Sequence, residues 1–163
     1  MRTSRSATRW ITRTALLLAL TLAIQMLGLP QWVTGPAVNA LLLISGLIIS
    51  PASGVVIGLF TPIIAVWRGI VPPVLAPMVP FISAGNAVFV LLFMALRGRQ
   101  QYLGLVLAAA AKFIILAAAV RYIVSLPQAV AYMMQFPQLV TALVGGAFAL
   151  VIYELLKNTA MMN

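Results

Sequence analysis

The sequence contains no cysteine and no histidine, and Glu154 is its single acidic residue. Without cysteine there can be no disulfide and no thiolate chemistry, and without histidine the commonest metal ligand is missing. One carboxylate cannot form the acid–base pair on which many hydrolases depend. We therefore expect neither an enzyme nor a metal site, and no cofactor.

Charged residues of any kind are scarce, at 7% of the 163 residues, whereas 64% are hydrophobic. A soluble domain needs more polar residues to cover its surface, so lipid must surround most of this chain. Since one membrane-crossing helix needs about 20 residues, the chain has room for about six spans joined by short connections. The sequence predicts an all-α polytopic membrane protein that forms a single transmembrane domain over residues 1–163.

Proline, glycine and serine interrupt the apolar sequence and mark the ends of the spans. The segment 30–36 (PQWVTGP) ends the first span, and the prolines between residues 72 and 80 make a regular helix there unexpected. The second span is about 13 residues long, or roughly 20 Å, which is short of a hydrocarbon core of about 30 Å. Neighbouring helices must therefore support it, or the preceding loop dips into the membrane. The predicted spans are 12–29, 37–49, 52–67, 81–96, 102–126 and 137–156.

The net charge is +9, but the basic residues flank the apolar runs, which indicates topology and contact with anionic lipid instead of nucleic-acid binding. Four arginines lie in the first 13 residues, and Arg97 and Arg99 separate the fourth span from the fifth. The segments 30–36 and 125–136 carry no charge. The positive-inside rule then predicts a multi-pass protein of the cell membrane with both termini in the cytoplasm. Its first 11 or so residues form a basic cytoplasmic segment, followed by a retained first helix and not a cleaved signal.

Lys112 is the clearest candidate for function, because a charge at the bilayer centre costs roughly 3 kcal/mol or more. It lies about ten residues into the fifth span, a depth of about 15 Å, which is beyond the reach of one lysine side chain. We expect Lys112 to face a polar cavity; a partner subunit or a shorter span is the alternative. Arg121 is about half a turn out of phase with Lys112, so at most one of them should contact a ligand unless the helix bends.

Further candidates lie near the predicted extracellular ends of the spans. Arginine there can hold a carboxylate or phosphate, although interfacial arginine and aromatic residues often contact only lipid. Amides inside a span need a partner, which a neighbouring helix or a ligand can supply. Together they would suit a small, partly apolar ligand that is anionic or neutral. The candidate substrate-binding residues are Trp32, Thr34, Asn39, Arg68, Asn86, Lys112, Arg121, Tyr122 and Gln138.

Small residues recur at helical spacing on three spans, and such faces let helix backbones approach closely. We expect the glycine stripes to pack inside this chain: Gly54 with Gly58 on the third span, and Ala142, Gly145, Gly146 and Ala149 on the sixth. The alanine stripe of the first span begins beside the basic residues, so it serves either internal packing or the docking of a partner. It consists of Ala15, Ala19 and Ala23.

The alanine stripe, the segment TGPAVNALL after the first outer loop, and the stretches GLFTPIIA, PFISAGNA and PQLVTALVGGAFAL resemble the S components of energy-coupling factor (ECF) transporters. The likeness covers most of the chain. It implies an S-component-like bundle in a prokaryotic plasma membrane, with a high-affinity site for a vitamin or related micronutrient in the outer half. It also implies that Ala15, Ala19 and Ala23 dock on a transmembrane coupling subunit, which carries two cytoplasmic ATPase subunits. Nickel and cobalt members use an N-terminal histidine, which is missing here.

The alternative is a structural membrane protein of the MreD type, which would bind no ligand and use its small-residue stripes for assembly. The two hypotheses predict different interiors. A substrate-binding subunit should contain an outer pocket with a polar cluster, whereas a scaffold should be tightly packed throughout.

Overall fold

The computed structural model describes residues 2–159, with side chains from residue 6 onward, and this part of the chain is helical without any strand. The all-α prediction is therefore confirmed. The elements, in chain order, are α1 (Arg2–Met26), α2 (Gln31–Ile48), α3 (Pro51–Trp67), the 3₁₀ helix η1 (Pro73–Met78), α4 (Val79–Tyr122), α5 (Gln128–Met133) and α6 (Phe136–Asn158).

Four helical stretches of the described chain are long and apolar enough to cross a membrane. They are Ser6–Met26, Gln31–Ile48, Pro73–Tyr122 and Gln128–Asn158. The apolar helix α3 is slightly shorter, at 17 residues. These lengths and compositions agree with a membrane protein.

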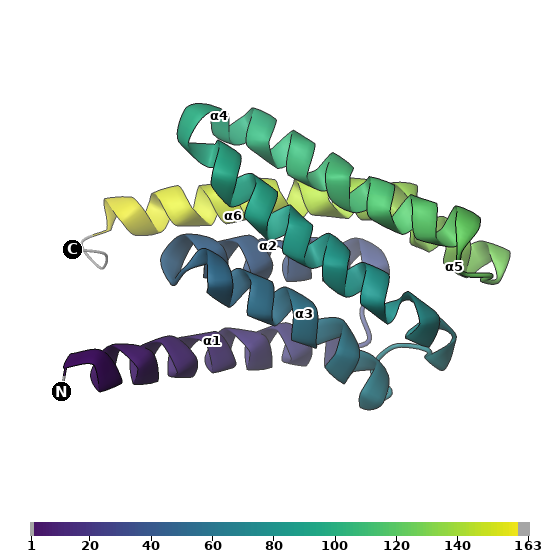
Figure 1. The fold of residues 1–163 in the computed structure, drawn as a ribbon, viewed down its shortest axis with the longest axis horizontal. Helices are drawn as coiled ribbons and strands as arrows, with labels where there is room; N and C mark the ends of the chain where they lie inside the picture. Colours follow the sequence, from purple (N-terminus) through teal and green to yellow (C-terminus); the bar gives the residue numbers. More distant parts are fainter. Residues whose placement is uncertain (1, 160–163) are drawn as a thin grey trace.

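Helix α4 is a hairpin of two arms. Its 44 residues include the predicted fourth span and all but the last four residues of the predicted fifth, and the backbone leaves the helical region at Gln100, with φ −149° and ψ 92°. The chain turns back on itself there, so the second arm runs antiparallel to the first (Figure 1). Near the turn the arms touch closely: a Cβ atom on Gly104 would lie 3.0 Å from Leu96 Cβ. The two predicted spans are thus separate arms without an intervening loop.

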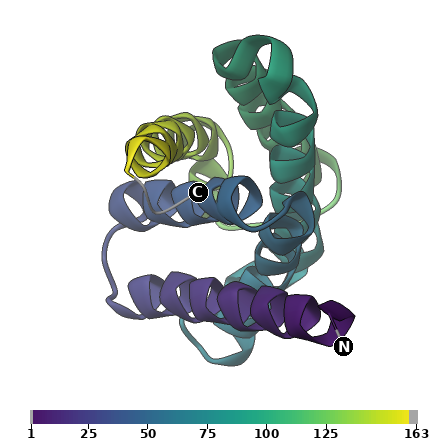
Figure 2. The same ribbon diagram turned by 90° about the vertical axis from the view of Figure 1, so that its left-hand side faces the viewer.

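The helices alternate in direction, so the described ends of the chain lie at the same end of the bundle (Figure 1). Helix α2 occupies the centre and contacts α1, α3, α4 and α6, while α1 lies at the edge (Figure 2). Apolar side chains fill the interior around α2, and Leu42, Leu43, Ile57, Phe89 and Phe93 are fully buried. The packing of these apolar side chains holds the helices in place. The polar side chains that the helices carry near the core are thereby positioned as well.

Glycines allow the closest helix contacts, as the glycine stripes predicted. A Cβ atom on Gly54 would lie 2.7 Å from the backbone oxygen of Leu42, and one on Gly145 would collide with the backbone oxygen of Pro36. Only a residue without a side chain fits at such distances. The stripes on α3 and α6 therefore pack inside the chain.

The start of α2 corrects the predicted loop at 30–36. The helix begins at Gln31 and includes Pro36, so it has 18 residues instead of about 13. Proline so near the N-terminus removes one intrahelical hydrogen bond, and packing of Pro36 against α6 outweighs that loss. At 1.5 Å per residue α2 is about 27 Å long, so it needs no re-entrant loop to complete a crossing.

The proline-rich connection is more regular than the sequence suggested. Three of its prolines lie in or next to the 3₁₀ helix η1, and Pro80 lies in the first turn of α4, where its missing N–H costs nothing. Helix α3 ends before it in a Schellman motif: Ile70 N–H donates to Ala65 O and Gly69 N–H donates to Val66 O. Gly69 has φ +68°, which glycine adopts without strain.

Candidate functional site

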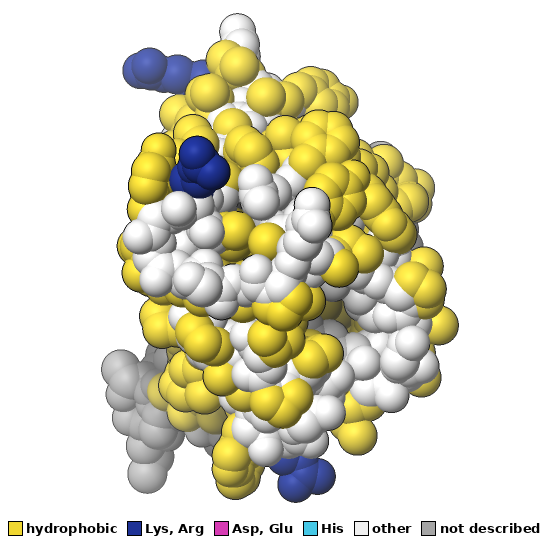
Figure 3. All heavy atoms as spheres, turned by 90° about the vertical axis from the view of Figure 1, so that its right-hand side faces the viewer, with side chains coloured by type: hydrophobic (Ala, Val, Ile, Leu, Met, Phe, Trp, Pro, Cys, Tyr) yellow, Lys and Arg dark blue, Asp and Glu magenta, His cyan; other side chains and the backbone are white. Residues whose placement is uncertain are grey.

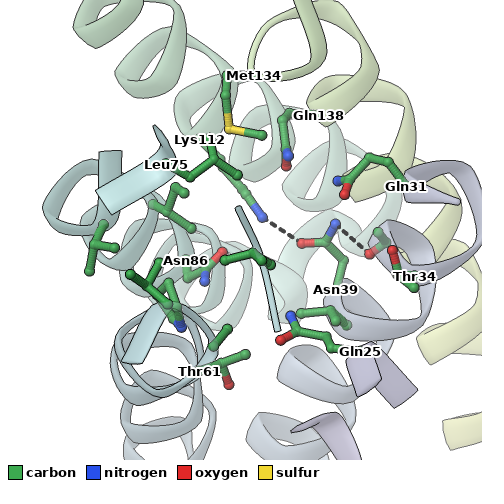
Figure 4. Close-up of a pocket in the computed structure, with 18 residues that line it drawn as sticks. Gln25, Gln31, Thr34, Asn39, Thr61, Leu75, Asn86, Lys112, Met134 and Gln138 are labelled. Carbon is green, nitrogen blue, oxygen red and sulfur yellow. Dashed lines mark hydrogen bonds between the residues drawn. The ribbon is translucent and has the colours of Figure 1, made fainter. Parts of the chain in front are cut away.

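A cavity of about 100 Å³ lies in the half of the bundle away from the described chain ends. It is enclosed by the end of α1, the start of α2, the second half of α3, η1, both arms of α4, and the start of α6 (Figure 4). Its polar lining residues are Gln25, Gln31, Thr34, Asn39, Thr61, Asn86, Lys112 and Gln138, and apolar side chains such as Leu75, Ile82 and Met134 complete the wall.

Lys112 projects from the second arm of α4 into this cavity, and the residue is only 3% exposed. Its Nζ donates a hydrogen bond of 2.6 Å to Asn39 Oδ1 and lies 5.5 Å from the centre of the Phe89 ring. Lys112 therefore lies among the polar side chains that line the cavity. Glu154, the single acidic residue, lies near the other end of the bundle on the last turns of α6.

Asn39 is oriented by a second hydrogen bond, because its Nδ2 donates to Gly35 O at 2.9 Å in the preceding turn of α2. The side-chain oxygen must then point away from the helix, toward Lys112 (Figure 4). This arrangement is rigid, since Gly35 and Asn39 both pack against α6. The α2 helix thus holds an acceptor in place for a cation that lies 73 positions later in the sequence.

Asn86 connects two walls of the cavity. Its Nδ2 donates a 3.0 Å hydrogen bond to Gly58 O, and a Cβ atom on Gly58 would lie 2.9 Å from Asn86 Cβ. One turn earlier on α4, Ser83 Oγ donates to Leu59 O at 3.0 Å. The first arm of α4 is therefore fixed to α3 by two side-chain hydrogen bonds at the level of the cavity.

Two glutamines in the cavity lack a hydrogen-bond partner in the described part of the chain. Gln138 is 8% exposed and its side-chain amide makes no hydrogen bond there, and Gln25 Oε1 is a buried acceptor without a donor. A buried polar group left unpaired costs about 1–3 kcal/mol, and native proteins usually satisfy it with water or a ligand. The buried Gln25 oxygen therefore indicates a space suited to a polar molecule, and the Gln138 amide also faces that space.

The sequence interpretation missed Gln25, Gln31 and Thr61. Gln25 lies within the predicted first span, so its polarity at that depth was an available signal. Gln31 fell in the segment predicted to be a loop. The Thr61 hydroxyl donates to Ile57 O at 2.7 Å, a common intrahelical bond that gave no reason to select this residue.

Four predicted binding residues lie outside the cavity. Arg121 and Tyr122 are exposed at the end of α4, because nine positions place Arg121 on the opposite side of the helix from Lys112. Arg68 is exposed because it caps the last turn of α3. Trp32 is 47% exposed and lines a separate apolar groove between α2 and α6. Seen from this end of the bundle, Lys and Arg side chains lie near the rim and no acidic side chain is visible (Figure 3).

The alanine stripe of α1 faces away from the bundle, and Ala15, Ala19 and Ala23 are all exposed. Other residues of α1 attach it to the rest. Thr14 Oγ1 and Ser53 Oγ share a buried hydrogen bond of 2.8 Å, and Trp10 Nε1 donates to Ser50 Oγ at 2.8 Å. The stripe is therefore not used for packing within the described chain.

Comparisons with protein-family models, with curated proteins and with solved structures give no match. The functional argument therefore depends on two features of the molecule itself. One is a polar cavity that contains a buried cation and unpaired amides, and the other is a small-residue face left open on α1. Such a cavity can bind a small molecule.

Proposed function

We propose that this chain is the membrane-embedded substrate-binding subunit of an ATP-driven importer of the ECF type. It captures a vitamin or related micronutrient, anionic or neutral, in the cavity around Lys112. Six segments cross the plasma membrane of a prokaryote: α1, α2, α3, the two arms of α4, and α6. Both termini then lie in the cytoplasm and the cavity lies in the extracellular half.

The observation that carries this proposal is the cavity itself. A lysine deep in an apolar bundle, bonded to Asn39 and surrounded by Asn86 and Gln138, has no role in a tightly packed scaffold. Intramembrane ionisable residues are costly and usually serve binding or transport. A small concave site with a few oriented polar groups is also the usual form of a ligand pocket. These features favour a substrate-binding subunit over a scaffold of the MreD type.

The open face of α1 supports a docking partner. Small residues at every fourth position let another helix approach closely, and the bundle leaves Ala15, Ala19 and Ala23 uncovered. The proposed partner is a transmembrane coupling subunit that carries two cytoplasmic ATPase subunits. ATP hydrolysis would then belong to those subunits and not to this chain.

The proposal is tested by thermal unfolding of the purified protein in detergent against a panel of micronutrients. A ligand present at 100 times its dissociation constant should stabilise the folded state by about 2.7 kcal/mol. Copurification of ATPase subunits from native membranes tests the partners. If no compound raises the unfolding temperature and no ATPase subunit copurifies, the scaffold hypothesis is the better one.

A further inference from the structure

The charge in the cavity limits what can bind there. Lys112 Nζ carries three N–H donors, and the described residues provide it with one acceptor, Asn39 Oδ1. Glu154, the only carboxylate side chain of the sequence, lies near the other end of the bundle. A buried cation without a counter-ion is costly, and a charge-assisted bond to an anionic oxygen removes that cost. The site therefore lacks one anionic group, which a ligand can supply.

Gln138 lies where it can bind the same anion. The residue is 8% exposed, its amide has no hydrogen bond to another described residue, and the amide points into the space that Lys112 Nζ enters (Figure 4). The amide N–H groups can donate to one carboxylate oxygen while Lys112 donates to the other.

Gln25 needs a hydrogen-bond donor from the ligand, whereas Lys112 and Gln138 need an acceptor. Its Oε1 is buried, lines the cavity, and has no donor among the described residues. Since an unpaired buried acceptor is costly, the ligand should offer an N–H or O–H group to it. That donor is uncharged, because the cavity has no carboxylate with which to balance a second cation.

Charge balance also decides between a carboxylate and a phosphate. A carboxylate carries one negative charge and neutralises Lys112, whereas a phosphate monoester carries about 1.5 to 2 at pH 7. Arg68 and Arg121 do not line the cavity and cannot neutralise the excess there. A second negative charge would therefore be buried without a partner.

We infer that the cavity binds a compact monocarboxylate that also carries an uncharged N–H or O–H donor. The carboxylate contacts Lys112 and Gln138, and the donor contacts Gln25. This inference rests on the proposed function and specifies its substrate class.

The test compares matched compounds by titration calorimetry and thermal unfolding of the full chain in detergent. The acids with a donor are 4-aminobenzoate, biotin and pantothenate; their uncharged counterparts are 4-aminobenzamide, biotinamide and pantothenol. Benzoate and octanoate are carboxylates without a donor, and octanoate also represents a lipid-derived acid. We expect at least one acid with a donor to bind, and its uncharged counterpart to bind at least tenfold more weakly. We expect benzoate and octanoate to be weaker by a similar factor.

Two variants test which residue causes the preference for acids and which causes the preference for donor-bearing compounds. Lys112→Met should abolish the preference for the acid over its uncharged counterpart, and Gln25→Leu should abolish the preference for donor-bearing acids. Lys157→Met and Gln128→Leu make the same changes at exposed positions outside the cavity and should leave both preferences intact. Lys112→Arg keeps the charge and should retain the preference for acids. This variant shows whether the effect of Lys112→Met comes from the lost charge or from misfolding.

The possible failures are distinguishable. If an uncharged counterpart binds as tightly as its acid, the inference is wrong although the binding function stands. If octanoate and benzoate match the donor-bearing acids, the role of Gln25 is wrong. If none of these compounds and no micronutrient binds, both the inference and the proposed function fail.

Discussion

Replacement of Gly145 by alanine tests the contact on which the site is built. A Cβ atom at Gly145 would collide with Pro36 O and lie 2.8 Å from Asn39 Cβ, at the interface of α2 with α6. Pro36 O is a backbone atom, so the helices themselves must separate. Overpacking of this kind costs about 1–3 kcal/mol, while the helical preference of alanine over glycine returns at most about 1 kcal/mol. We expect a net loss of about 1–2 kcal/mol.

The control is the same change at Gly98, a helical position in α4 where a Cβ atom would meet nothing within 4 Å. Here the helical preference acts alone, so Gly98→Ala should stabilise the protein by about 0.5–1 kcal/mol. At about 2–4 °C per kcal/mol for a chain of this size, the two variants should differ by several degrees in thermal unfolding. Equal unfolding temperatures would mean that α2 and α6 do not approach as closely as described. Since Gly145 also touches Asn39, ligand affinity should fall in Gly145→Ala and remain unchanged in Gly98→Ala.

Three further predictions concern the proposed function. Arg121→Ala should leave ligand affinity unchanged, because this side chain is exposed and outside the cavity; a tenfold loss in calorimetry would show that the cavity extends to it. Ala19→Leu should abolish uptake by cells while the purified protein binds ligand normally, and impaired binding would instead assign Ala19 to internal packing. Asn39→Asp should give Lys112 a counter-ion within the chain. The protein should then bind anionic ligands at least tenfold more weakly, whereas unchanged anion affinity would separate Lys112 from ligand binding.

The helical architecture followed from hydrophobic content and from the spacing of proline, glycine and serine. The predicted helix boundaries were wrong where packing outweighed the local preference of a residue. Pro36 has the properties of a helix breaker, yet it lies inside α2 because the glycine at position 145 leaves space for its carbonyl. A single sequence does not reveal that two segments more than 100 positions apart fit together.

The candidate site was predictable in part. Depth within a span identified Lys112, and the same physical cost applies to the amides Asn39, Asn86 and Gln138, which the structure brings to the same cavity. Proximity to the predicted extracellular ends of the spans was a weaker guide, since Arg68 and Arg121 share that level but are exposed outside the cavity. Side-chain direction depends on helix phase and on how the helices are rotated in the bundle, and only the packed structure gives that rotation.

The bond between Lys112 and Asn39 has a consequence for biogenesis. The ribosome makes α2 well before the second arm of α4, so the acceptor already exists when the lysine emerges. Insertion of a lone lysine at mid-membrane costs about 2.5–3.5 kcal/mol on translocon scales. A hydrogen bond to the Asn39 amide, which is inserted earlier, reduces that cost. We therefore expect the α4 hairpin to enter the bilayer efficiently only after the N-terminal helices have assembled.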